Sequence, residues 1–134
     1  MNNTEIVKKA YECFGRGDIE ELMGLYSDDV SWEIPKVDNA AYSGARRGKA
    51  AVSEFFELLA KSQTFTAFEP KEFIAEGDKV VVLGRSEANV IASGKTFSTE
   101  WVHISTLADG KITAFTEFFD TAAANQAHQL HATA

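Results

Sequence analysis

His103 is the only histidine in the strand-like part of this sequence, and alternation places it with Trp101 on one face of the stretch 95–107. An imidazole exchanges protons near neutral pH, so a pocket-facing His103 would be a proton shuttle or a hydrogen-bonding partner for a ligand. The alternative is a structural histidine whose hydrogen bonds are satisfied within the core. Glu117 shares a strand face with Phe119 in the same way, which would set a carboxylate beside an aromatic ring.

The second half of the chain predicts an antiparallel sheet that positions these side chains. Four strand-like stretches cover residues 64–75, 79–91, 95–107 and 111–119. Short turn-forming segments separate them, and the Asp109–Gly110 dipeptide is a strong hairpin signal. Both faces of the strands mix apolar and polar residues. We therefore expect a sheet covered on both sides, by helices on one and a second subunit on the other, and the alternation alone does not say which face is which.

The first half of the chain predicts helices. Apolar residues recur at helical spacing over 4–16 and 49–61, and a capping-box-like start at Asp18 predicts a short helix over 18–25. A short strand over 30–34 and a loop to Gly48 lie between them, and 122–134 is a helix or tail. Helices followed by a long antiparallel sheet indicate an α+β fold, with a ligand pocket where the two layers meet.

Composition limits the classes of function. The 134 residues predict one domain, and a net charge of −7 argues against nucleic acid, since the only basic cluster is Arg46, Arg47 and Lys49. No stretch is long enough to span a membrane, and no signal peptide is expected. The single Cys13 cannot form an internal disulfide, which fits a cytoplasmic protein. His128 and His131 are three apart, but nothing brings them to His103, so neither a metal nor a cofactor is expected.

The C-terminal segment 109–120, DGKITAFTEFFD, preceded by VHISTL at 102–107, resembles the last hairpin of SnoaL-like proteins. These belong to the NTF2-like superfamily, with ketosteroid isomerase, polyketide cyclases and limonene epoxide hydrolase. The sequences YSDDVSW at 26–32 and RGKAAV at 47–52 agree with it, in order and in spacing. The resemblance implies a cone in which a curved sheet wraps three N-terminal helices around an apolar pocket, and a homodimer formed through the outer sheet face.

The resemblance also implies a site. Alignment with the epoxide hydrolase puts Arg85, Glu87 and Glu117 where that enzyme has an Asp-Arg-Asp constellation, although both aspartates are glutamates here. An Arg between two carboxylates lowers the pKa of both while burial raises them, so one acid can stay protonated and the other ionised. The alternative is an exposed cross-strand ion pair. His103 would be an auxiliary donor. The expected ligand-binding residues are Trp32, Glu33, Tyr42, Trp101 and Phe119.

The expected function is binding of a small apolar organic molecule, with or without chemistry. Three reactions without a cofactor are open: isomerisation, cyclisation and epoxide hydration, with Glu117 as the leading acid or base. In cyclases of this type an acid near the end of the last strand is the base, and Asp120 could match it, although its position before Thr121 also suits a helix N-cap. The alternative class is a ligand-binding or protein-interaction module with no turnover.

Overall fold

The computed structural model describes residues 1–130 and consists of one six-stranded sheet with helices on one side of it. The helices are α1 (Asn3–Arg16), α2 (Ile19–Met23), α3 (Lys49–Ser62) and α4 (Thr121–His128). The strands are β1 (Tyr26–Ile34), β2 (Gly44–Arg47), β3 (Gln63–Glu76), β4 (Lys79–Val90), β5 (Thr96–Ala108) and β6 (Lys111–Phe119).

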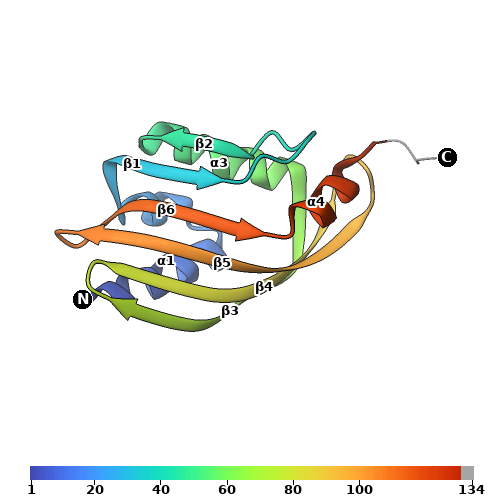
Figure 1. Cartoon of the computed structure of the whole chain (residues 1–134). Helices are drawn as coiled ribbons and strands as arrows, with labels where there is room; N and C mark the ends of the chain where they lie inside the picture. The colour runs from blue at the N-terminus through green and yellow to red at the C-terminus, as the bar shows by residue number, and fades with distance from the viewer. Residues whose placement is uncertain (131–134) are drawn as a thin grey trace.

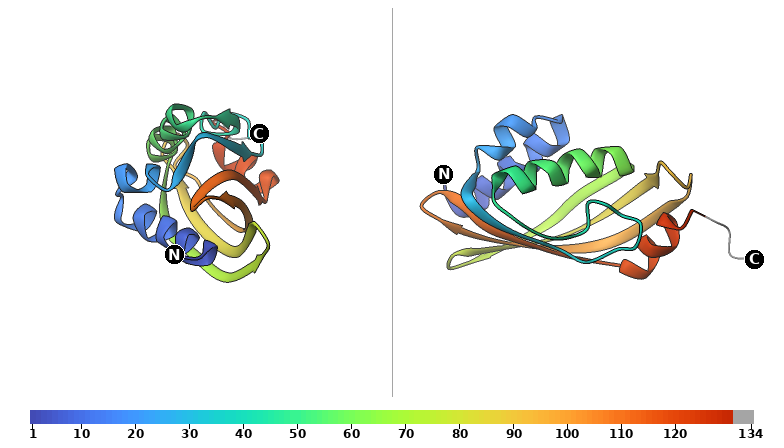
Figure 2. Two further views of the ribbon diagram at one scale, coloured as in Figure 1. Left: turned by 90° about the vertical axis from the view of Figure 1, so that its left-hand side faces the viewer. Right: turned by 90° about the horizontal axis from the view of Figure 1, so that it is seen from above.

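The sheet has the strand order β2-β1-β6-β5-β4-β3, and only the β1–β6 pair is parallel. It is strongly curved, with α1 and α3 lying along its concave face and α4 at the end where β6 finishes (Figures 1 and 2). This is the α+β cone that the sequence predicts. The layers enclose a core rich in aromatic side chains between the helices and the sheet.

Local signals explain most of the element boundaries. The Asn2 side chain and Glu5 form a capping box at the start of α1, and Gly17 ends the helix in the left-handed conformation (φ +72°). Asp120 accepts a hydrogen bond from the Ala123 amide at 3.0 Å and caps α4, as its position before the helix predicts. Asp109 and Gly110 both have positive φ in the β5–β6 turn, which their sequence favours.

Three boundaries differ from the prediction. The strand expected over 30–34 begins at Tyr26, which pairs with Ile112 of β6. Residues 44–47, expected in a loop, form the edge strand β2 against β1. The C-terminal helix ends at His128, and residues 131–134 lie outside the described part of the chain.

Three strands depart from regular pairing. In β3 the register with β4 shifts twice, after Phe65 and after Pro70. In β6 the register with β5 shifts at Thr113, where Thr106 is opposite Ala114 but Leu107 is opposite Ile112. Such bulges insert one residue and bend the strand, which contributes to the curvature of the sheet. The described β1–β6 pairing also shifts, between Tyr26 and Ser31.

Gly84 allows a large ring to lie against the sheet. It is opposite Trp101 in the β4–β5 register, and a Cβ atom built on it would lie 2.4 Å from the Trp101 ring and 2.6 Å from the Glu69 carbonyl oxygen. Because one of these neighbours is backbone, the clash cannot be relieved by rotating a side chain alone. Glycine at this position therefore fixes where the Trp101 indole packs.

We expect Gly84→Ala to lower the free energy of unfolding by about 1–3 kcal/mol, the usual effect of overpacking a core. Urea unfolding followed by circular dichroism measures this difference. The control is Gly15→Ala in α1, where a Cβ would meet no atom within 4 Å. That variant should be neutral or slightly more stable, since alanine favours a helix over glycine. Equal stability of the two variants would contradict the packing role of Gly84.

Candidate functional site

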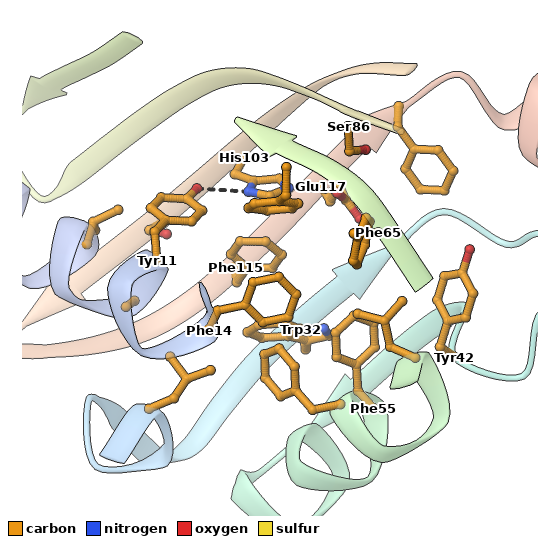
Figure 3. Close-up of a pocket in the computed structure, with 18 of the residues that line it drawn as sticks. Tyr11, Phe14, Trp32, Tyr42, Phe55, Phe65, Ser86, His103, Phe115 and Glu117 are labelled. Carbon is orange, nitrogen blue, oxygen red and sulfur yellow. Dashed lines mark hydrogen bonds and ion pairs between the residues drawn. The ribbon is translucent and has the colours of Figure 1, made fainter. Parts of the chain in front are cut away.

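A cavity lies between the concave face of the sheet and the helices (Figure 3). Its volume is about 100 Å³, several times the ~10–15 Å³ that one water molecule occupies. Most of its wall is aromatic: Tyr11, Phe14, Tyr26, Trp32, Tyr42, Phe55, Phe56, Phe65, Phe68, Phe97, Phe115 and Phe119. The described lining residues contain no Lys or Arg, and Glu117 is their only carboxylate. The cavity therefore suits an uncharged, largely apolar molecule.

A chain of three polar side chains crosses the wall of this cavity. His103 of β5 is directly opposite Glu117 of β6, and their Nε2 and Oε2 atoms are 2.6 Å apart. The other ring nitrogen, Nδ1, lies 2.8 Å from the hydroxyl of Tyr11 in α1. The side chain of His103 is only 5% exposed and that of Glu117 19% exposed. One helix and two strands thus bring together a phenol, an imidazole and a carboxylate.

Burial determines which group donates and which accepts in these hydrogen bonds. It is the largest of the influences that raise the pKa of the Tyr11 phenol, followed by the negative charges that Tyr26 and Glu117 can carry. Tyr11 therefore keeps its proton, and its hydroxyl donates a hydrogen bond to His103 Nδ1. In the neutral imidazole the remaining proton is then on Nε2, where it is donated to the Glu117 carboxylate. Every polar atom of His103 is used within the protein.

One oxygen of the carboxylate stays available. Glu117 Oε2 accepts the bond from His103, whereas Oε1 has no hydrogen-bond partner among residues 1–130. Because Glu117 lines the cavity, this second oxygen is the acceptor that a bound molecule would meet. The Ser86 and Ser105 hydroxyls also line the cavity, and neither has a hydrogen-bond partner among the described residues.

Aromatic rings hold the imidazole in place. The Trp101 ring stacks on His103 with centroids 3.8 Å apart and planes at 11°, and Phe115 meets it edge-on at 4.8 Å. Trp101 itself is not among the residues that line the cavity, so it acts on the site through His103.

Arg85 and Glu87 lie elsewhere, and the expected grouping of Arg85, Glu87 and Glu117 is wrong. The cavity side of β4 carries small residues such as Gly84 and Ser86, so the alternate residues point to the outer face of the sheet. There Arg85 pairs with Glu69, and its Nη2 lies 3.6 Å from Glu87 Oε2. All three side chains are at least one-third exposed, which is the cross-strand surface pair that the sequence left as the alternative.

The expected ligand-binding residues divide in the same way. Trp32, Tyr42 and Phe119 line the cavity. Glu33 does not: it is exposed, because Trp32 and Ile34 on either side of it take the buried positions of β1. Its expected place in the pocket is therefore wrong.

Sequence reasoning missed Tyr11 and Gln63. Tyr11 was visible as part of the apolar face of the first helix, together with Val7, but its hydroxyl carried no signal of a partner 92 positions away. Gln63 marks the end of α3 and the start of β3, and only the fold shows that it is buried.

No cluster of three potential metal ligands exists within the described residues. His128 is buried in α4, where its Nδ1 donates to the Ala124 carbonyl oxygen at 2.9 Å. His131 lies outside the described residues. No described helix has the length and apolar character needed to cross a membrane.

Comparison with known proteins identifies the family. The model of the SnoaL-like domain matches residues 7–115, so the chain belongs to the SnoaL-like family. An NTF2-like protein from Burkholderia xenovorans LB400 is 31% identical, with 95% of each chain covered and a TM-score of 0.86. TerC, crystallised with polyporic acid, is also 31% identical, with 94% of this chain and 97% of its own covered and a TM-score of 0.80.

A protein with a cystatin-like fold from Xanthomonas campestris is 28% identical, with 93% of this chain and 96% of its own covered and a TM-score of 0.80. No curated protein matches the chain. The expected superfamily and fold are thereby confirmed.

Removing the Tyr11 hydroxyl tests the hydrogen-bonded chain. We expect Tyr11→Phe to lower the free energy of unfolding by about 1–3 kcal/mol, because His103 Nδ1 would stay buried without a donor. Tyr26→Phe is the matched control, since that buried tyrosine makes no side-chain hydrogen bond within the described residues. Urea unfolding of both variants gives the comparison. A Tyr26→Phe loss as large as that of Tyr11→Phe would contradict the assigned role.

Proposed function

We propose that this protein binds a small, mostly apolar organic molecule in its aromatic cavity and catalyses a proton transfer on it. The observation that carries the proposal is the Glu117 carboxylate: one oxygen is bonded to His103, and the other faces an apolar cavity without a partner among residues 1–130. The second oxygen faces the cavity, where it can accept a proton from a bound molecule at hydrogen-bond distance. Glu117 is the base, His103 orients it, and Tyr11 fixes the imidazole.

The substrate of this step has an acidic C–H bond beside a carbonyl group. Glu117 Oε1 takes the proton, the C–H electron pair moves towards the carbonyl, and an enolate forms. If the ligand has a C=C bond conjugated with the enolate, return of the proton from Oε1 to the far carbon of this system completes an isomerisation. If the ligand has a second carbonyl group, the enolate carbon attacks its carbon, the C=O π bond opens, and the alkoxide takes the proton back from Oε1, which completes a cyclisation. The outward position of Arg85 and Glu87 removes the residues on which an epoxide-hydrolase type of reaction was expected to depend.

Membership of the SnoaL-like family supports an organic ligand, as does the polyporic acid in the TerC crystal. The second candidate is a binding module of the same fold without turnover. One observation favours it: both ring nitrogens of His103 have partners within the protein, so the imidazole offers no free atom to a ligand. Proton exchange on a bound ligand separates the two candidates.

The test uses ring-bearing ketones and lactones that raise the melting temperature of the protein. Incubated in D₂O, the wild type should catalyse deuterium incorporation beside the carbonyl group, measured by NMR. Glu117→Gln should slow this exchange about 10²- to 10⁴-fold while keeping the fold, because an amide cannot accept the proton. Glu87→Gln, the same change on the outer face, should leave the rate unaltered. Equal rates in the wild type and Glu117→Gln would exclude Glu117 as the base.

The outer face of the sheet supports a second proposal, a homodimer. On this face Leu83, Val102 and Ile104 form a half-buried apolar surface at the centre of the sheet. Phe118 extends it and is 55% exposed. A two-fold contact would place the same surface of a second copy against it and bury these side chains.

Light scattering at micromolar concentration should therefore give the mass of two chains. Phe118→Glu should convert the protein to a monomer, because it places a charge in the apolar contact. Ile91→Glu makes the same change at a side chain that is 57% exposed in the β4–β5 turn, and should leave the dimer intact. A monomeric wild type would overturn the dimer proposal and leave the proposed chemistry untouched.

A further inference from the structure

A buried amide lies at the end of the cavity away from His103. Gln63 begins β3 directly after α3, lines the cavity, and is only 7% exposed. It is opposite Val90 of β4, whereas His103 is opposite Val82, so most of the length of β4 separates the two. Glutamine is rarely buried to this extent, and a buried amide is stabilised only when its polar atoms find partners.

Only one of the two polar atoms of this amide has a hydrogen-bond partner among the described residues. The Tyr42 hydroxyl donates to Gln63 Oε1 at 3.2 Å. The amide nitrogen Nε2 has no acceptor among residues 1–130. Burial, chiefly, raises the pKa of Tyr42, so its proton stays in place and needs an acceptor. The reverse amide orientation would leave this proton without one, and the bond therefore directs the NH₂ group of Gln63 away from Tyr42.

Two properties, one of the NH₂ group and one of the cavity, define what Gln63 can bind. The NH₂ group is a donor, so its partner on the ligand is a hydrogen-bond acceptor. The described lining contains no Lys or Arg, so nothing there offsets the charge of a carboxylate or phosphate. A carbonyl oxygen satisfies both conditions, since it accepts a hydrogen bond and carries no net charge.

We propose that Gln63 is a specificity-determining residue whose amide donates to a carbonyl oxygen at one end of an uncharged, elongated, ring-bearing ligand. This carbonyl lies at the Tyr42 end of the cavity, and the reacting part of the ligand lies at the Glu117 end (Figure 3). The inference deepens the proposed function and rests on it, because it assumes that the cavity is the ligand site. Tyr42 is the positioning residue that holds the amide.

The experiment measures the affinity of three naphthalene probes by calorimetry. The probes are 2-acetylnaphthalene, which carries a carbonyl acceptor, 1-(2-naphthyl)ethanol, which also carries a donor, and 2-ethylnaphthalene, which carries neither. Gln63→Met keeps the length of the side chain and removes the amide. It should weaken binding of the ketone about threefold to tenfold, the value of one neutral hydrogen bond, without weakening binding of the hydrocarbon.

Gln63→Glu supplies a second, independent variant of similar shape. Its carboxylate accepts hydrogen bonds, so binding of the ketone should fall while the alcohol, which donates, becomes the preferred probe. The matched control is Gln126→Met, the same substitution at an exposed position of α4, which should change none of the three affinities. Thermal unfolding of each variant shows whether it is folded.

Two results would overturn the inference: an equal loss for ketone and hydrocarbon in Gln63→Met, or no binding of any probe to the wild type. Glu117→Gln separates it from the proposed chemistry. That variant should keep the preference that depends on Gln63 even though it loses proton exchange. A ketone preference lost in Gln63→Met but exchange unaffected in Glu117→Gln would leave the subsite standing and refute the catalytic role of Glu117.

Discussion

The hydrogen bond between His103 and Glu117 is the interaction on which the inner architecture depends. A carboxylate among aromatic rings is costly unless a donor satisfies it, and the imidazole is the donor directly opposite it on the next strand. The other ring nitrogen, Nδ1, needs a donor, which the Tyr11 hydroxyl provides from the first helix. The same hydrogen bonds therefore fix α1 against the sheet and satisfy the polar groups in the wall of the cavity.

In this arrangement each polar group of the cavity has a different role. The bond to His103 occupies one carboxylate oxygen and orients the other, and the Trp101 ring limits the motion of the imidazole. At the far end, Tyr42 does for the Gln63 amide what Tyr11 does for His103: a buried phenol that keeps its proton fixes the direction of a neighbouring group. Rigid placement of few polar groups in an apolar wall is what gives such a cavity selectivity.

The sequence predicted the helices and the three hairpins well, because caps and turn residues are local signals. The alternation left open which face of β4 points inward, and the alignment with the epoxide hydrolase chose the wrong one. The cavity side of that strand needs small residues, above all Gly84 beneath the Trp101 ring, so the conspicuous Arg85 and Glu87 were assigned to the wrong side. The contact between Tyr11 and His103 depends on how a helix packs across a curved sheet, and no local pattern encodes it. His103 was found because it is the one histidine of the predicted strands and shares a face with Trp101, whereas Glu117 was found through the family resemblance.

The bulge at Thr113 has a consequence for the chemistry of the whole molecule. Ile112 and Phe115 both point inward although they are three residues apart, an odd spacing that regular alternation forbids. The extra residue shifts the alternation of β6 by one position after Ile112, so that Phe115 and Glu117 also point inward. In an unbulged strand Thr116 and Phe118 would enter the cavity, and Glu117 would point to the outside. One extra backbone residue, outside the cavity lining, thus decides whether the protein has an internal carboxylate.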